Sequence, residues 1–237
     1  MNWRDYRNSA AKMTLPNRSF NKVFGIGYNK TGTTTLAFIL KALAFRVPVQ
    51  CEQEMRIVKQ LDLGNFGPLV AFVQQYDAFQ DLPFSQDDCY AQVDGLFPNS
   101  RFILTTREPE SWFKSLCSFH AKAWGVNDVR ELSEASFKDR NLYLYENYIY
   151  EVTKKIITVA RDGRPYADWD LLYDKDFYID FFRNRNDRII KYFSNRPDDL
   201  LVIDFEKEVD ISKILNFFGF SQKLNCPIPH LNKTDEL

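Results

Sequence analysis

The residues of this chain best suited to hold an anion follow its first apolar run. Residues 23–27 (Val-Phe-Gly-Ile-Gly) predict a short strand, and a Lys-Thr-Gly-Thr-Thr sequence begins three positions later, at Lys30. A strand-to-helix turn presents backbone N–H groups at the positive end of a helix dipole, which favours phosphate. Gly32 would let the backbone approach the anion, and Lys30 would add a mobile positive charge. Thr33 and Thr34 would supply hydroxyls and cap the helix.

This loop is not a Walker A motif. In that motif the lysine follows the last glycine and precedes Ser or Thr, whereas Lys30 stands two positions before Gly32. The structural alternative is an ordinary strand-to-helix turn with a threonine cap. The apolar strand before the loop and the helical pattern after it favour the phosphate site.

A second candidate anion contact follows a later apolar run, residues 101–105. Arg107 would lie at the carboxyl end of that strand, and Ser115 two turns along a helix that opens near Pro109. A guanidinium fork can grip a phosphate while a serine hydroxyl adds a directed bond. An arginine at a strand end is structural about as often, so the pair alone is less specific than the loop.

The elements that must position these residues alternate between strands and helices. Strands are predicted at residues 23–27, 77–80, 101–105 and 200–203. Helices are predicted at residues 33–45, 51–76 with a break near 64–67, 86–97, 109–123, 141–160, 174–193 and 211–218.

This alternation predicts a three-layer α/β fold, in which a mostly parallel central sheet is flanked by helices in a P-loop-like nucleotide-binding arrangement. Ligands of such sheets bind beyond the carboxyl ends of the strands. The rule selects three loops, residues 27–35, 80–83 and 105–109.

Composition narrows the possible partners. The 237 residues carry 31 Lys and Arg against 32 Asp and Glu, a net charge of −1, so no basic surplus favours nucleic acid. The first residues lack the apolar core of a signal peptide, and no 18-residue apolar run occurs, so we expect no membrane span and a cytoplasmic protein.

Four widely spaced cysteines predict neither a disulfide framework nor a zinc site. We expect one domain over residues 1–237, with a polar segment at 1–21 and a tail at 221–237.

Together the two anion motifs resemble those of the sulfotransferases that use 3′-phosphoadenosine 5′-phosphosulfate (PAPS). In that family a Lys-(Ser/Thr)-Gly-Thr-(Thr/Ser) loop binds the 5′-phosphosulfate, and an Arg followed eight positions later by Ser binds the 3′-phosphate. The resemblance covers about residues 22–220. It implies that the phosphosulfate is held by Lys30, Thr31, Gly32, Thr33 and Thr34, and the 3′-phosphate by Arg107 and Ser115.

The chain resembles a short, divergent member of that family. Residues 80–83 (Gln-Asp-Leu-Pro) are similar to the Thr-His-Leu-Pro segment that carries the catalytic histidine in cytosolic members, which makes Asp81 the candidate base. His120, late in a helix, ranks second, and His230 lies in a Pro-flanked tail. Thr35 stands where relatives have the tryptophan that packs on adenine, and the Arg-Lys-Gly motif near the C-terminus is missing.

The resemblance implies transfer of a sulfuryl group from PAPS to a hydroxyl or amine of a small, partly apolar acceptor. The second product would be adenosine 3′,5′-bisphosphate, and no metal would be required. Two other classes stay open. A P-loop-type kinase or NTPase is suggested by an apolar strand ending in Asp204, as in a Walker B site. A non-catalytic nucleotide-binding module would keep the anion loops without the chemistry.

Overall fold

A computed structural model of the chain describes residues 19–138, 143–220 and 227–228. Most of the predicted polar segment 1–21 and most of the tail 221–237, with His230, lie outside the described residues. The chain divides into two compact units, one of Met1–Glu108 with Arg188–Leu237 and the other of Pro109–Asp187.

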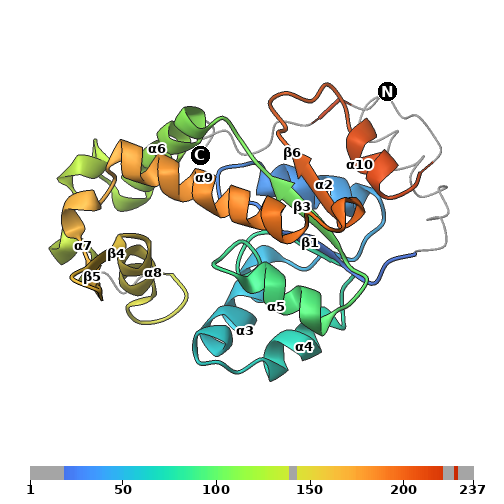
Figure 1. The fold of residues 1–237 in the computed structure, drawn as a ribbon, viewed down its shortest axis with the longest axis horizontal. Coiled ribbons are helices and arrows are strands. Elements are labelled where there is room, and N and C mark those ends of the chain that lie inside the picture. Colours follow the sequence, from blue (N-terminus) through green and yellow to red (C-terminus); the bar gives the residue numbers. More distant parts are fainter. Residues whose placement is uncertain (1–18, 139–142, 221–226, 229–237) are drawn as a thin grey trace. The chain divides into compact units, whose positions relative to one another are not determined.

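The first unit is built on a four-stranded parallel sheet. Its strands run in the order β2 (Ala78–Phe79), β1 (Val23–Gly25), β3 (Arg101–Thr105) and β6 (Leu200–Ile203), and each neighbouring pair is parallel (Figure 1). The chain is therefore an α/β protein with a central parallel sheet, as the alternation of strands and helices predicted.

Helices cover both faces of this sheet. Successive side chains of a strand point to opposite faces, so Val23 packs into one hydrophobic cluster and Phe24 into another. The Val23 cluster includes residues of α2 (Thr33–Ala42) and α10 (Ser212–Phe217). The Phe24 cluster includes residues of α3 (Gln50–Asp62), α4 (Gly67–Val73) and α5 (Cys89–Leu96). These groups of helices lie on opposite sides of the strands, which confirms the three layers (Figure 1).

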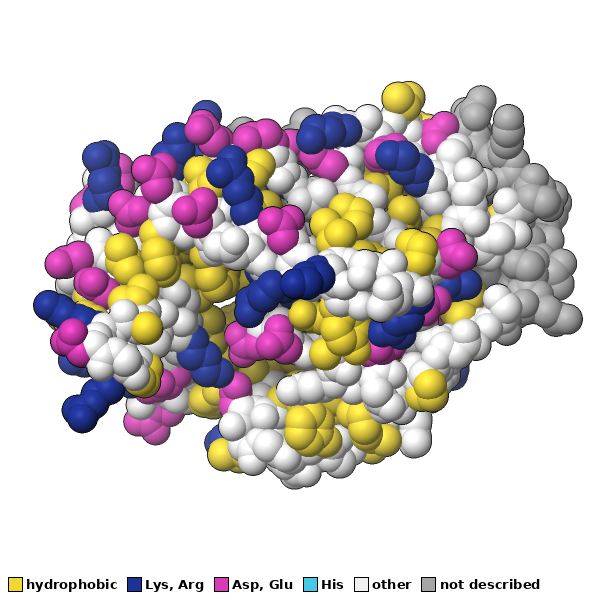
Figure 2. All heavy atoms as spheres, in the orientation of Figure 1, with side chains coloured by type: hydrophobic (Ala, Val, Ile, Leu, Met, Phe, Trp, Pro, Cys, Tyr) yellow, Lys and Arg dark blue, Asp and Glu magenta, His cyan; other side chains and the backbone are white. Residues whose placement is uncertain are grey.

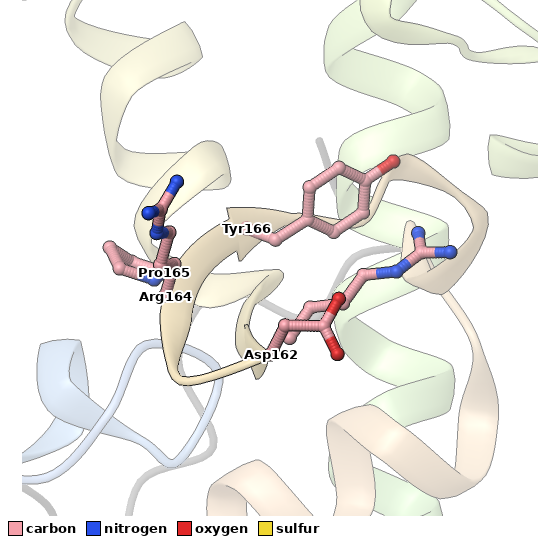
Figure 3. Close-up of a pocket in the computed structure, with 5 residues that line it drawn as sticks. Asp162, Arg164, Pro165 and Tyr166 are labelled. Carbon is pink, nitrogen blue, oxygen red and sulfur yellow. The ribbon is translucent and has the colours of Figure 1, made fainter.

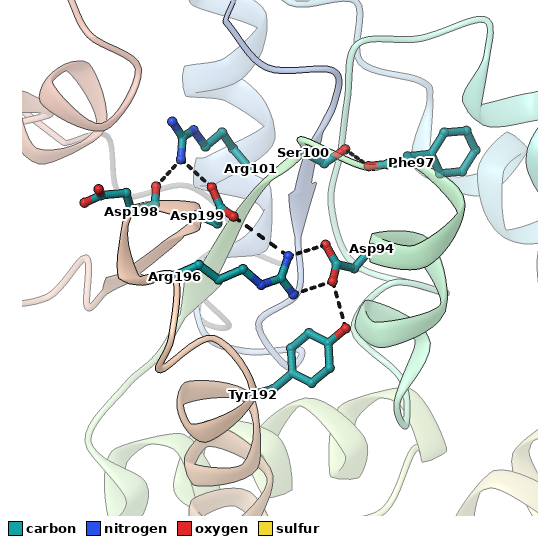
Figure 4. Close-up of polar contacts among 8 residues, drawn as sticks. All are labelled: Asp94, Phe97, Ser100, Arg101, Tyr192, Arg196, Asp198 and Asp199. Atoms are coloured by element: carbon teal, nitrogen blue, oxygen red, sulfur yellow. Dashed lines mark hydrogen bonds and ion pairs between the residues drawn. The ribbon is translucent and has the colours of Figure 1, made fainter.

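Charged side chains join the amino end of β3 to neighbouring elements of the first unit (Figure 4). Arg196 binds both carboxylate oxygens of Asp94 on α5, one of them at 2.9 Å, and the Tyr192 hydroxyl donates to the same carboxylate at 2.7 Å. Arg101, the first residue of β3, pairs with Asp199 at 2.6 Å. The Asp94 carboxylate thereby ties α5 to the segment that leads into β6.

The second unit contains α6 (Pro109–Trp124), α7 (Glu134–Lys138), α8 (Tyr148–Ile156) and the antiparallel hairpin of β4 (Thr158–Arg161) and β5 (Arg164–Ala167). The helix α9 (Lys175–Tyr192) begins in this unit and ends in the first. The helix predicted at residues 141–160 is wrong at both ends: α8 begins only at Tyr148, β4 starts at Thr158, and residues 141–142 lie outside the described range. An Asp162-Gly163 turn with positive φ at both residues, the usual signal for a two-residue hairpin, reverses the chain there.

The other predicted helices are present with their ends shifted by a few residues, and the break near residues 64–67 separates α3 from α4. Within the described ranges, none of the helices combines the length and the apolar character needed to cross a bilayer. On the face drawn in Figure 2, lysine and arginine side chains lie interspersed with aspartate and glutamate side chains.

Candidate active site

The three loops selected by the sheet rule meet at the carboxyl ends of β1, β2 and β3. The Thr33 hydroxyl, on the first residue of α2, donates to Asp81 Oδ2 at 2.8 Å. From the loop after β3, the Arg107 guanidinium donates to the Lys30 carbonyl oxygen at 3.4 Å. Four of the residues singled out from the sequence are therefore brought together, and all four belong to the first unit.

The loop after β1 is bound to β3 by its own side chain. Thr31 is buried, and its hydroxyl donates to the Tyr28 carbonyl oxygen and lies 2.7 Å from the Thr105 hydroxyl. At Gly27 there is no space for a side chain, since an added Cβ would lie 1.9 Å from Thr105 Oγ1. The Thr31 hydroxyl thus holds the loop against β3.

Gly32 has two structural reasons to be glycine. It is the N-cap of α2 with φ of 93°, in the left-handed region, and an added Cβ would lie 2.7 Å from Phe205 Cδ2. No side chain caps this helix, so the prediction that the threonines cap it is wrong. Thr33 donates to Asp81 instead, and Thr34 is exposed. Thr35 is only 4% exposed, which leaves it no surface on which adenine could stack.

The Asp81 carboxylate is held by three donors. Besides the Thr33 hydroxyl, the backbone N–H of Leu82 donates at 3.0 Å and the Ser85 hydroxyl at 3.3 Å. Asp81 does not cap α5, the next helix, whose N-cap is Asp88. Burial is the largest influence and raises the pKa of the Asp81 carboxyl, although the three hydrogen bonds and the positive charge of Lys30 oppose the shift. A raised pKa brings a carboxylate closer to the basicity that proton transfer near neutral pH requires.

Two glutamines of α3 hold the loop that carries Asp81, and the sequence analysis missed both. The Gln53 side-chain amide, 1% exposed, donates to the carbonyl oxygens of Gln80, at 2.9 Å, and Leu82. The Gln80 side-chain amide donates to Gln50 Oε1 at 2.5 Å. The sequence shows only that two glutamines fall in this helical stretch, which does not reveal their partners.

Two cations lie close together beside the N-terminus of α2. Burial first, and then the positive charge of Arg107, lower the pKa of the Lys30 ammonium, while Asp81 opposes the shift. Arg107 also pairs with Glu206, which follows β6, at 2.5 Å between Nη2 and Oε1. The arrangement suits an anion, because neighbouring positive groups and a helix N-terminus both favour negative charge.

The turn after β6 was not predicted as part of this site. Asp204, considered from the sequence as a Walker B aspartate, accepts the Glu206 backbone N–H at 3.0 Å and pairs with Lys207 at 3.2 Å. Its carboxylate therefore shapes the turn that sets Phe205 against Gly32. Among the residues that the structure describes, no three His, Cys, Asp or Glu side chains are grouped to hold a metal ion.

Ser115 and His120 belong to the second unit, on α6. Ser115 is partly buried in the second turn of that helix. The His120 Nδ1 lies 2.9 Å from the hydroxyl of Tyr173, a buried side chain whose ring also contacts the imidazole. Burial raises the pKa of the Tyr173 hydroxyl. His120 is therefore engaged in the packing of its own unit.

A pocket of the second unit lies on the β4–β5 hairpin (Figure 3). Its lining is Arg161, Asp162, Arg164, Pro165 and Tyr166. None of these is a residue that the sequence analysis assigned to a site. The residues that the sequence did assign to phosphosulfate, Lys30 to Thr34, lie in the first unit with Asp81.

Comparison with known families agrees with this architecture. A family model described as a sulfotransferase domain matches residues 22–237. The chain therefore belongs to the sulfotransferase family. A search of curated proteins finds no match to it.

Proposed function

We propose that this protein transfers a sulfuryl group from PAPS to a hydroxyl or amine of a small acceptor. The observation that carries the proposal is the meeting of Lys30, Arg107 and Asp81 at the carboxyl ends of three neighbouring parallel strands. A cationic pair at a helix N-terminus suits a nucleotide that carries phosphate groups at its 3′ and 5′ positions. The carboxylate beside the pair suits an acceptor that must lose a proton.

The electrostatics of Lys30 and Arg107 support a doubly anionic ligand. Burial first, and then the positive charge of Arg107, lower the pKa of Lys30, so holding both cations in this site costs free energy. An anion bound between them would recover that energy. By the family resemblance, Lys30 faces the 5′-phosphosulfate and Arg107 the 3′-phosphate, joined in the second case by Ser115.

In this proposal each residue has a distinct task. Lys30 neutralises the charge that grows on the bridging oxygen as the S–O bond of the donor breaks. The N–H groups of the loop and the hydroxyl of Thr34 orient the non-bridging oxygens. Asp81 accepts the proton from the acceptor as its oxygen or nitrogen bonds to sulfur, and later releases that proton to solvent. Sulfuryl transfer resembles phosphoryl transfer, so positioning and charge stabilisation supply most of the catalysis.

The contacts of Asp204 favour this proposal over a kinase or NTPase. A Walker B aspartate serves a magnesium ion, whereas the Asp204 carboxylate accepts a backbone N–H and pairs with Lys207. The contact between Thr33 and Asp81 also favours an enzyme over a passive nucleotide-binding module. A passive module would gain nothing from a partly buried carboxylate with a raised pKa beside its anion loop.

A thermal-shift panel tests the proposal. Adenosine 3′,5′-bisphosphate should raise the melting temperature of the chain clearly, because ligand stabilisation grows with concentration over Kd. ATP with magnesium should raise it far less. Stabilisation by ATP with magnesium alone would overturn the proposal in favour of a kinase or NTPase. With PAPS and a panel of phenols, alcohols and amines, formation of the bisphosphate should depend on the acceptor.

A further inference from the structure

The guanidinium of Arg107 is held by a carboxylate of the protein itself. Arg107 Nη2 lies 2.5 Å from Glu206 Oε1, and Nη1 lies 3.4 Å from the Lys30 carbonyl oxygen. The Arg107 side chain is 24% exposed and that of Glu206 is 48% exposed. Arg107, the more buried partner, carries the positive charge suited to a phosphate. Glu206, the more exposed partner, covers that charge.

The backbone of Glu206 is fixed while its side chain reaches solvent. The backbone N–H donates to Asp204 Oδ1, and the preceding Phe205 lies against Gly32. The turn therefore aims the Glu206 carboxylate at the guanidinium from a constant position. Half-exposed, that carboxylate can turn towards solvent without unpacking the turn.

A carboxylate and a phosphate compete for the same geometry, because each accepts paired N–H bonds from one guanidinium. We propose that Glu206 determines donor affinity and selectivity by occupying Arg107 until a 3′-phosphate displaces it. This inference rests on the proposed function, in which Arg107 holds that phosphate. A doubly charged phosphate can displace the carboxylate, whereas a ribose hydroxyl at the same place cannot.

The consequence for affinity follows from the fraction of molecules in which Arg107 is available. A ligand that needs a partly populated state binds more weakly by that fraction, so a pair closed about 80% of the time weakens binding about five-fold. Glu206→Gln removes the competing charge and keeps the side-chain shape. It should tighten adenosine 3′,5′-bisphosphate about five-fold and change adenosine 5′-phosphate less than about two-fold.

Isothermal titration of these two nucleotides into wild type and Glu206→Gln gives the test. Glu208→Gln is the matched control, because it removes the same charge two residues further along, where the carboxylate contacts Lys213 instead. This control should leave both affinities within about two-fold of wild type. Melting curves without ligand verify that each variant is folded.

The Arg107→Ala background separates the inference from the proposed function. There, Glu206→Gln should have no effect on bisphosphate binding, since the contact that it relieves is gone. One result would overturn this inference alone. Glu206→Gln would bind the bisphosphate no more tightly than wild type, while Arg107→Ala would still lose affinity for the bisphosphate and not for adenosine 5′-phosphate. Failure of the wild-type chain to bind the bisphosphate would overturn the proposed function and the inference together.

Discussion

The hydroxyl of Thr33, the first residue of α2, donates a 2.8 Å hydrogen bond to the carboxylate of Asp81, which follows β2. The bond joins the loop proposed to hold the phosphosulfate to the group proposed to accept the proton. The protein framework thereby fixes the distance between the bound sulfuryl donor and the base. Only the sulfuryl acceptor then has to be positioned. Such fixed geometry supplies much of the rate in transfer reactions with little covalent chemistry.

Replacing Asp81 by Asn should lower kcat at least about a hundred-fold, the low end for loss of a general base. The amide keeps the shape: its oxygen can accept the Leu82 and Ser85 hydrogen bonds, and its NH₂ group can donate to the Thr33 hydroxyl in place of Oδ2, but it takes no proton. Affinity for PAPS should be intact, and the melting temperature should stay within a few degrees. Steady-state turnover and calorimetric melting provide the measurements.

The pH profile checks the same assignment. Because burial raises the pKa of Asp81, wild-type kcat should fall on the acid side at a pH above the usual value of about 3.9 for aspartate. That limb should vanish in Asp81→Asn. Normal turnover in this variant together with a large loss in His120→Ala would assign the base to His120.

Lys30→Ala should lower kcat by about a hundred- to a thousand-fold at saturating PAPS, because a charge contact made mainly in the transition state acts on kcat. Lys41→Ala removes the same charge from the last turn of α2 and serves as the control. Its turnover should match wild type. Near-normal turnover in Lys30→Ala would remove Lys30 from the mechanism.

Arg107→Ala should weaken PAPS binding about a hundred-fold and leave the affinity for adenosine 5′-phosphosulfate, which lacks the 3′-phosphate, within about two-fold. Ser115→Ala should act in the same direction by about five-fold, the loss of one hydrogen bond. Direct titration of both nucleotides measures the ratio. Equal losses for both nucleotides would make Arg107 a structural residue.

Gly32→Ala should destabilise the fold by at least about 2 kcal/mol. About 1 kcal/mol comes from an alanine at positive φ, and the remainder from the clash with Phe205. Gly64→Ala is the control, since Gly64 also has positive φ but has no atom within 4 Å of an added Cβ. In chemical unfolding, Gly64→Ala should lose only the ~1 kcal/mol that comes from an alanine at positive φ. Equal losses at both sites would mean that the contact with Phe205 contributes nothing.

Asp94→Asn should lower the free energy of unfolding by about 1–2 kcal/mol at pH 7. Burial alone would raise the pKa of Asp94, but its bonds from Arg196 and Tyr192 outweigh that and lower it. The stabilisation is therefore present above the unfolded pKa near 3.9 and is lost as pH falls through the folded value. Unfolding curves of wild type and variant should converge towards pH 3. Asp198→Asn, an exposed neighbour, should change little at either pH.

The sheet and the position of the site could be predicted from the sequence. Apolar runs such as residues 101–105 mark buried strands whatever their partners are, and parallel strands place their carboxyl ends at one edge. Lys30, Asp81 and Arg107 follow three such runs, so their meeting required no knowledge of side-chain contacts. The family match over residues 22–237 supports the same architecture.

Side-chain partners from distant segments could not be predicted in this way. Gln53 and Glu206 gain their roles from residues 27 and 99 positions away, and a polar residue has no periodicity that reveals its partner. The threonine cap failed because a glycine at positive φ occupies the N-cap of α2. The hairpin after α8 was missed although an Asp-Gly pair marks it, because the helical pattern before that pair was extended too far.

Gln50 and Gln53 of α3 also satisfy backbone groups at the margin of the sheet. β2 is an edge strand of only two residues, and edges with unsatisfied backbone groups invite pairing with another chain. Gln53 satisfies the carbonyl oxygens of Gln80 and Leu82, at and just past the point where the strand stops. Beside the strand itself, the backbone N–H groups of Asp77 and Ala78 donate to the Arg46 carbonyl oxygen. Replacing Gln53 by an apolar residue would therefore take this donor from the carbonyl oxygen of Gln80, a residue only 7% exposed, and the end of β2 would lose stability.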